Sequence, residues 1–175
     1  MFGGRASRST AFLSFFYIYI MCIFALDFSL IPTIMDASFL PRGLRNHNPL
    51  NIRKSADKWQ GSAKVQADKS FVTFVSNAYG YRAAMKTIKT YMSRGRVTPD
   101  QIIKQWAPPS ENNTEGYIRN VCSMSGIGRN EKISLRNEEQ MVALIHAMAI
   151  VENGIKYLEF IKEEEIRQGY HLAFG

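Results

Sequence analysis

One carboxylate near the end of an apolar segment is well placed for acid catalysis. Glu152 follows Met141 by eleven positions and Met148 by four. At about 100° per residue, both spacings place Glu152 within about 40° of the apolar stripe of a helix. Burial among apolar groups disfavours the ionised form of a carboxyl, which lets a glutamate keep its proton near neutral pH as a general acid. The alternative is that Glu152 turns outward at the helix end and pairs with Lys156.

The cysteines and histidines do not form a metal site. Cys22 lies in an apolar run and Cys122 in a predicted helix, and such a pair builds neither a disulfide framework nor a zinc site. His47, His146 and His171 lie far apart, without the spacing of metal ligands. The sequence therefore predicts chemistry without a metal or another cofactor.

Start and stop signals predict four helices and one broken helix. Asn137 is a typical N-cap for the helix that carries Glu152. We expect this helix to run from residue 138 to about 151, to be central and buried, and to stop at Asn153-Gly154. The other expected helices cover residues 77–93 after Ser76, a short segment from the Thr98 cap to near Trp106, a segment capped by Thr114 that ends at Gly126, and a broken helix over residues 155–174 with a solvated face at 163–165.

A small extended part precedes these helices. Residues 42–53 are rich in Asn, Gly and Pro and should form an ordered loop that ends in a short extended piece at 50–53. A turn around residues 59–61 follows, and residues 70–75 alternate as a short strand does. The chain has 175 residues, of which 46% are hydrophobic and 21% charged. This predicts one α+β domain, mostly α, with a central buried helix and a small β element.

The net charge of +7 favours a polyanionic partner. The first 36 residues are neutral, because two arginines are matched by two aspartates, so residues 37–175 carry the whole excess. Nucleic acid, anionic lipid and bacterial cell wall all fit this charge. The lysines and arginines are scattered, and no nucleic-acid-binding fingerprint occurs, so we expect no specific nucleic-acid partner.

Residues 1–36 are predicted to be separate from the folded domain. Arg5 and Arg8 precede an apolar run over residues 11–26, a pattern typical of a secretory signal or an uncleaved anchor. The run has 16 residues, fewer than the roughly 20 that span a bilayer, which favours the signal. No clean cleavage triplet follows it. The third interpretation is that translation begins at Met35.

Several short motifs resemble, in their order, those of lysozyme-like and glucosaminidase-type glycosidases. They are N-H-N-P-L-N-I (46–52), W-Q-G (59–61), F-V-T-F (71–74), G-Y-R-A-A (80–84) and N-N-T-E-G-Y-I-R-N-V (112–121). The glutamate-helix motif that precedes them in such enzymes is absent in front, since no Glu occurs before Glu111. A-M-A-I-V-E-N-G (147–154) stands near the C-terminus instead. This order indicates a circular permutation, which is tolerated when termini lie close together.

Two longer runs also resemble phage virion-associated and prophage-encoded lysozyme-like structural proteins. They are R-G-L-R-N-H-N-P-L-N-I-R (42–53) and W-A-P-P-S-E-N-N-T-E-G-Y-I (106–118). The resemblance covers about residues 40–154, with Glu-Asn-Gly where the family has Glu-Ser-x-Gly. It implies a lysozyme-like catalytic domain over residues 37–175. Such a domain cleaves the β-1,4 glycan strands of bacterial peptidoglycan as a muramidase, a glucosaminidase or a lytic transglycosylase. Glu152 would be the general acid, and the anionic glycan strands the partner.

The sequence offers more than one candidate for the second acidic group of such an enzyme. Asp68, just ahead of the predicted strand, is the first choice and Asp57 the next, although either can be a turn residue that caps a backbone N–H. If neither faces Glu152, a single-acid transglycosylase assisted by the substrate's acetamido group is favoured over a two-carboxylate hydrolase. Glu111, in a polar loop that begins after Pro108-Pro109, is the rival for the acid itself.

Six polar residues are candidates for substrate binding, each with a structural alternative. They are Asn46, Asn48, Asn51, Asn113, Thr114 and Tyr117. The first three can hydrogen-bond sugar hydroxyls and acetamido groups, or hold their own loop through Asx-turns. The tyrosine can face a sugar ring, the acid or the core. Trp59 and Trp106 are expected to pack, although one of them can form a sugar-stacking wall.

Two other functions remain open at this point. A virion or envelope protein can keep a wall-binding lysozyme-like fold without activity, and DNA binding would fit the basic charge. The location depends on the N-terminal segment. A real signal predicts export to the periplasm or cell envelope, with transient membrane contact only through residues 1–36, and otherwise a phage virion or cytoplasmic location is expected.

Overall fold

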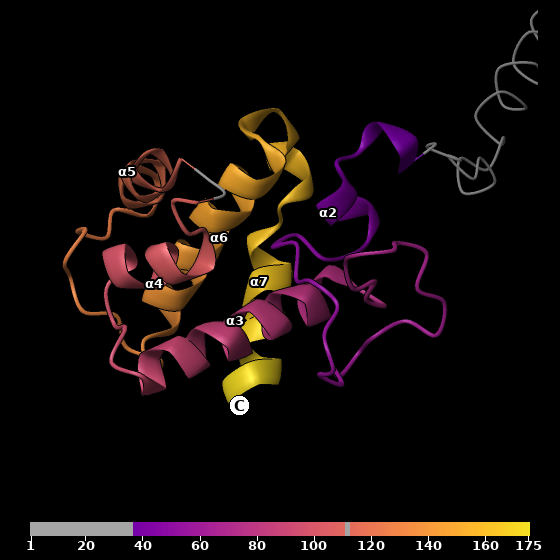
Figure 1. The fold of residues 1–175 in the computed structure, drawn as a ribbon, viewed down its shortest axis with the longest axis horizontal. Helices are drawn as coiled ribbons and strands as arrows, with labels where there is room; N and C mark the ends of the chain where they lie inside the picture. Colours follow the sequence, from indigo (N-terminus) through magenta and orange to yellow (C-terminus); the bar gives the residue numbers. More distant parts are fainter. Residues whose placement is uncertain (1–36, 111–112) are drawn as a thin grey trace, which may run out of the picture. The chain divides into compact units, whose positions relative to one another are not determined.

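α6, Glu138–Asn153, is the central helix of the fold (Figure 1). The computed structural model describes residues 37–110 and 113–175. α6 packs against α5, Thr114–Ser125, and α7, Glu163–Phe174. Its buried residues are Met141, Val142, Leu144, Ile145, Ala147, Met148, Ala149, Ile150 and Asn153. They face several directions around the helix, so α6 buries a wider apolar surface than the single predicted stripe.

The ends of α6 follow the predicted signals closely. Asn137 caps the first turn, because its Oδ1 accepts the backbone N–H of Gln140 at 3.2 Å. Gly154, with a φ of 91°, ends the helix. The last turn extends beyond the expected end near residue 151 and includes Glu152. The carboxylate is therefore held by regular helix and does not lie on a frayed end.

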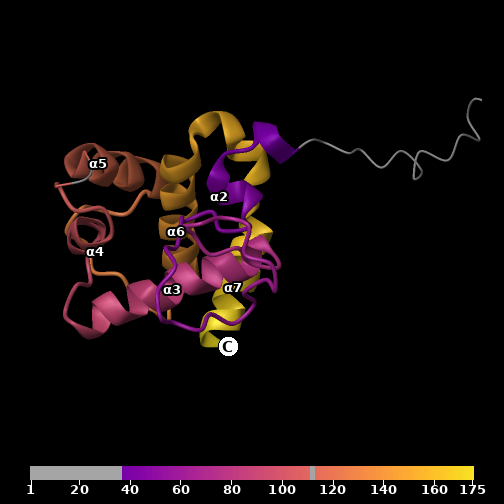
Figure 2. The same cartoon turned by 45° about the vertical axis from the view of Figure 1, so that its right-hand side comes forward.

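α3, Asn77–Ser93, packs closely against α7 and has the bounds predicted for it (Figure 2). Gly169 lies at their contact, where a Cβ would be 2.8 Å from the Cβ of Tyr81 and 2.9 Å from the carbonyl oxygen of Ala78. Only glycine allows this approach. The 3-10 helix η3, Ile155–Phe160, precedes α7 and confirms the prediction of a broken helix.

α4, Pro99–Trp106, is joined to α5 near the start of each helix. Thr98 caps α4 as predicted. The side chain of Arg129 lies 2.6 Å from Asp100 of α4 and 2.7 Å from Glu115 of α5. This network fixes the relative position of two helices that both reach the C-terminal end of α6.

The N-terminal part of the described chain differs from the prediction. A short helix, α2, Arg42–Arg45, forms inside the segment expected to be a loop, after the 3-10 turn η2, Ala37–Phe39. The continuous strand expected over residues 70–75 is wrong. Residues 37–110 and 113–175 contain two isolated antiparallel bridges, Arg53 with Phe71 and Ser62 with Phe74.

The side chain of Asn48 explains why no longer strand forms. Its Oδ1 accepts the backbone N–H of Ile52 at 2.8 Å. Its Nδ2 donates to the carbonyl oxygens of Ile52 at 2.9 Å and Val72 at 2.8 Å. The amide therefore occupies backbone groups that a neighbouring strand would otherwise use.

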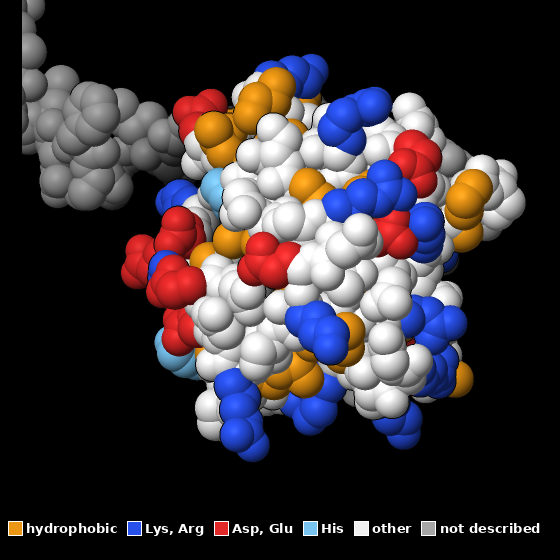
Figure 3. Space-filling view, turned by 90° about the vertical axis from the view of Figure 1, so that its left-hand side faces the viewer, with side chains coloured by type: hydrophobic (Ala, Val, Ile, Leu, Met, Phe, Trp, Pro, Cys, Tyr) orange, Lys and Arg blue, Asp and Glu red, His pale blue; other side chains and the backbone are white. Residues whose placement is uncertain are grey.

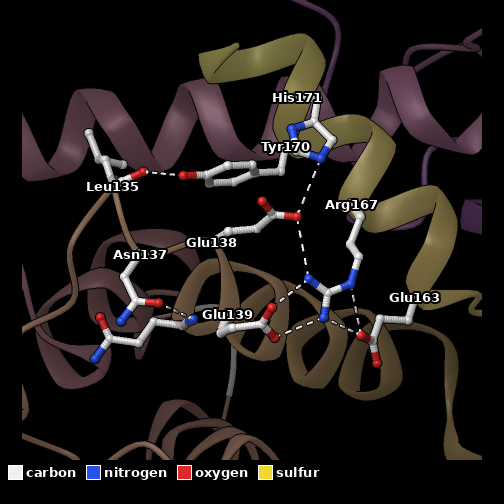
Figure 4. Close-up of polar contacts among 9 residues, drawn as sticks. Leu135, Asn137, Glu138, Glu139, Glu163, Arg167, Tyr170 and His171 are labelled. Atoms are coloured by element: carbon white, nitrogen blue, oxygen red, sulfur yellow. Dashed lines mark hydrogen bonds and ion pairs between the residues drawn. The ribbon is translucent and has the colours of Figure 1, made fainter.

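An ion-pair network around Arg167 joins α7 to the start of α6 (Figure 4). The guanidinium lies 2.7 Å from Glu139, 2.7 Å from Glu163 and 3.3 Å from Glu138. Hydrogen bonds to these carboxylates, that of Glu139 first, raise the pKa of Arg167 above its ordinary value. The charge of Arg167 is paired with carboxylates of the same cluster, and these ion pairs connect the two helices.

Basic side chains are spread over one face of the molecule, shown in Figure 3. On the face shown in Figure 3, Lys and Arg lie among acidic and neutral side chains and do not gather in one band. This agrees with their scattered positions along the sequence.

Two predictions concern residues outside the described part of the chain. They are the signal-like segment over residues 1–36 and Glu111, the rival for the acid. Among the helices that the structure does describe, none combines the length and the apolar character needed to cross a membrane.

Candidate active site

Three side chains from separate segments donate hydrogen bonds to Glu152. The Nε1 of Trp106 donates to Oε1 at 3.1 Å, and the hydroxyl of Tyr117 donates to the same oxygen at 2.9 Å. The Nδ2 of Asn51 donates to Oε2 at 2.9 Å. The ends of α4 and α6, the first turns of α5 and the Asn-rich loop therefore meet at one carboxylate.

Glu152 is half-buried and faces a pocket of about 430 Å³. The pocket is lined by Arg42, Leu50, Asn51, Ile52, Arg53, Phe71, Tyr91, Trp106, Ala107 and Glu152. This volume is in the range of small-molecule sites, which is about 300–1,000 Å³. The alternative that Glu152 pairs with Lys156 is wrong. No ion pair among the described residues joins these two side chains, and the carboxylate of Glu152 accepts hydrogen bonds from Asn51, Trp106 and Tyr117.

Asn51 reaches Glu152 from a left-handed backbone position. Its φ is 52°, in the left-handed region, where asparagine is one of the few residues with a side chain that occurs readily. The sequence prediction that Asn51 belongs to the site agrees with its place in the pocket lining. Its contact in this structure is to the carboxylate, which makes it a positioning residue for Glu152.

The loop that carries Asn51 is held from two sides. Asn153, buried at the end of α6, donates through Nδ2 to the carbonyl oxygens of Pro49 and Ala149, each at 2.8 Å. On the opposite side, a Cβ at Gly80 of α3 would overlap the carbonyl oxygen of His47. The loop is thus held between α6 and α3, and these contacts fix the position of Asn51 relative to Glu152.

The structure engages Asn46 and Asn48, which were predicted to bind substrate, in contacts that support their own loop. Asn48 is 0% exposed, and both atoms of its amide group are engaged with backbone groups. Asn46 is buried, and its Nδ2 donates to Asp68 at 3.1 Å. Both asparagines hold the loop, which is the structural alternative that the sequence left open.

Asp68 is also a structural residue. Its Oδ1 accepts the backbone N–H groups of Ser70 at 2.8 Å and Phe71 at 3.0 Å. These two bonds, followed by that from Asn46, lower the pKa of Asp68 below its ordinary value. Asp68 does not line the pocket of Glu152, so the structure does not bring the predicted second carboxylate together with the acid. Asp57 is exposed and accepts from its neighbour Ser55, as a turn residue does.

The start of α5 is built from two of the predicted sugar-binding residues. Asn113 is its N-cap, with Oδ1 accepting the backbone N–H of Gly116 at 3.0 Å. Thr114, which was expected to be the cap, is buried one position further on and donates to the carbonyl oxygen of Ala107 at 2.6 Å. Neither residue lines the pocket, and the contacts that the structure gives them build the start of α5.

Tyr117 is buried and directed at the acid, which was one of the alternatives for this residue. Burial raises its pKa well above the ordinary value, and the charge and hydrogen bond of Glu152 raise it further. The hydroxyl therefore keeps its proton and serves as a permanent donor to Oε1 of Glu152.

Sequence reasoning did not assign Trp106 to the acid, nor Tyr91 to the pocket. A tryptophan at the end of a helix needs a partner for its indole N–H when it is partly buried, and this requirement is the signal that could have found it. Tyr91 lies at the end of α3, where burial, partly offset by Arg94 and Arg96, raises its pKa. Trp59 packs against the core as expected.

A phage protein is similar to this chain over most of its length. Protein P5 of Pseudoalteromonas phage PM2 is 36% identical over 154 residues, which make up 86% of this chain and 91% of that protein. The chain belongs to the Protein P5 family. No family model matches the chain. The name Protein P5 states no activity, so the chemistry of this family member is inferred from its pocket.

Proposed function

We propose that this protein cleaves the β-1,4 glycan strands of bacterial peptidoglycan, with Glu152 as the general acid. The observation that supports this best is the convergence of three donors on one carboxylate that faces a sugar-sized pocket. A general acid must lie within hydrogen-bond reach of the oxygen that it protonates. A glycan strand bound in the pocket would place a glycosidic oxygen within this distance of the Glu152 carboxyl.

The three donors leave one oxygen of Glu152, Oε2, available for the acid proton. Oε1 accepts two hydrogen bonds, and the indole of Trp106 can only donate. Oε2 accepts one, from Asn51, and keeps the capacity to bind a proton. The Oδ1 of Asn51 is buried without a hydrogen-bond partner among the described residues. If the amide turns over, this oxygen can accept from a protonated Oε2, so Asn51 can hold Glu152 in either protonation state.

Cleavage then proceeds with Glu152 as the single carboxylate among the described residues that line the pocket. The proton on Oε2 passes to the glycosidic oxygen while the C1–O bond breaks. The oxygen of the substrate's own 2-acetamido group forms a bond to C1 and stabilises the positive charge there. The 6-hydroxyl of the same sugar next attacks C1, displaces the acetamido oxygen and returns a proton to Glu152. The product is a 1,6-anhydro sugar end.

We infer that the mostly helical fold is a lysozyme-like domain. In support, the motif segments that carry the resemblance, residues 46–52, 106–118 and 147–154, each contribute a side chain to the same hydrogen-bonded group. A circular permutation accounts for the late position of the glutamate helix. The phage origin of Protein P5 supports a role for this chain in a phage or prophage, as a virion component or a lytic enzyme.

Mass spectrometry of the products tests this proposal. We expect purified protein to release soluble muropeptides with 1,6-anhydro ends from a suspension of purified murein. Products with reducing ends, which are heavier by one water, would show that the protein cleaves the glycan by hydrolysis and not by attack of the 6-hydroxyl. If the protein co-sediments with murein and releases no soluble fragment, a non-catalytic wall-binding protein is the better interpretation.

A further inference from the structure

Two arginines lie against one aromatic ring in the pocket of Glu152. The Cζ of Arg42 is 3.7 Å from the ring centroid of Phe71, and the Cζ of Arg53 is 5.3 Å from it. Phe71 is buried, and a backbone bridge pairs it with Arg53. All three residues line the pocket together with the acid. We call Arg42 and Arg53 the arginine pair.

Guanidinium groups held in this way suit the recognition of a carboxylate. Contact with an aromatic face restricts the orientation of the guanidinium, so less freedom is lost when it binds a ligand. Its planar fork of N–H groups matches the two oxygens of a carboxylate.

The carboxylate of Asp68 lies near the arginine pair, and, after its hydrogen bonds, the charge of Arg42 contributes to lowering the pKa of Asp68. Its oxygens accept hydrogen bonds from the backbone N–H groups of Ser70 and Phe71 and from the side chain of Asn46. It is committed to its own turn and lies outside the pocket lining. Among the described residues that line the pocket with the arginine pair, the one carboxylate is that of the acid, Glu152.

We propose that the arginine pair binds a carboxylate of the substrate and so selects murein glycan over neutral acetamido-sugar polymers. The inference rests on the proposed function, because it places this carboxylate on a glycan strand whose glycosidic oxygen reaches Glu152. Two parts of murein carry the required group, the lactyl ether of the muramyl sugar and the peptide stem attached to it. The chemistry of recognition is the same for both.

Binding measurements on the full chain with Glu152→Gln test this without turnover. The probes are chitotetraose, the murein tetrasaccharide without peptides, and the same tetrasaccharide with peptide stems. We expect Arg42→Gln and Arg53→Gln, added to this background, to weaken binding of a carboxylated tetrasaccharide roughly five- to tenfold at low salt. Chitotetraose binding should stay within about twofold. Arg45→Gln, an exposed arginine of α2 outside the pocket, is the control and should change neither.

Each outcome decides a specific point. Equal losses for neutral and carboxylated probes, or no measurable binding of either carboxylated probe, overturn the inference. A loss confined to the stem-bearing probe assigns the peptide carboxylate, and a loss with both carboxylated probes assigns the lactyl group. Thermal unfolding of each variant shows whether the fold is kept, and the Arg→Lys variants separate charge from fork geometry. If the wild type does not cleave murein, the proposed function is wrong, but the selectivity for a carboxylate can still hold. If the wild type cleaves murein and the variants lose equal affinity for neutral and carboxylated probes, only the proposed selectivity is wrong.

Discussion

We expect Glu152→Gln to slow the release of soluble glycan from murein by about 10²–10⁴-fold, the contribution of a positioned general acid. The amide has the same shape as the carboxyl but no proton of suitable acidity. Its oxygen can still accept from Trp106 and Tyr117, and Asn51 can turn its amide to face the new N–H group. The unfolding temperature should therefore stay near that of the wild type. The initial rate of clearing and the thermal midpoint are measured on the same preparations.

The matched control is Glu159→Gln. Glu159 is an exposed carboxylate of η3, so its replacement changes the net charge equally without touching the pocket. This variant should clear murein at the wild-type rate. Equal losses in both variants would point to charge-driven attraction to the anionic wall, and retained activity in Glu152→Gln would move the acid elsewhere.

Asn48→Ala should lower the free energy of unfolding by about 3 kcal/mol, because it leaves buried backbone groups without partners. The N–H of Ile52 and the carbonyl oxygen of Val72 lose the bonds that the Asn48 side chain provides. The loop that carries Asn51 should loosen as a result, and activity should fall with stability. Urea unfolding at a fixed temperature measures the change.

Asn130→Ala is the control for this experiment, because Asn130 is exposed and the change should stay within about 0.5 kcal/mol. Asn48→Asp should be at least as damaging as the alanine variant, since it places a carboxylate where the two N–H donors were. Unchanged stability with weakened sugar binding would instead return Asn48 to the substrate-binding role that the sequence suggested.

Much of the helical scaffold could be predicted because its signals are local. Caps such as Thr98 and Asn137 lie directly before the first turns, and Gly126 and Gly154 mark helix ends. The apolar stripe in α6 also predicted the side of the helix on which Glu152 lies, because the period of apolar residues decides which face of a helix is buried. These predictions needed no knowledge of contacts between distant segments.

The roles of the asparagines could not be derived in this way. Asn46, Asn48 and Asn51 lie within one short segment of the same composition, and each can serve a ligand or the backbone. Their partners are 22, 24 and 101 positions away in the chain. Trp106 escaped assignment for the same reason, because its partner Glu152 is 46 positions away. Only the packed structure brings these pairs together.

A crystal structure of the Glu152→Gln protein with a murein tetrasaccharide is the decisive test of Glu152 as the acid. We expect a sugar chain in the pocket between Trp106 and the arginine pair, with a glycosidic oxygen about 2.6–3.2 Å from the side chain at position 152. A tetrasaccharide ordered on another surface, with the pocket empty, would contradict it.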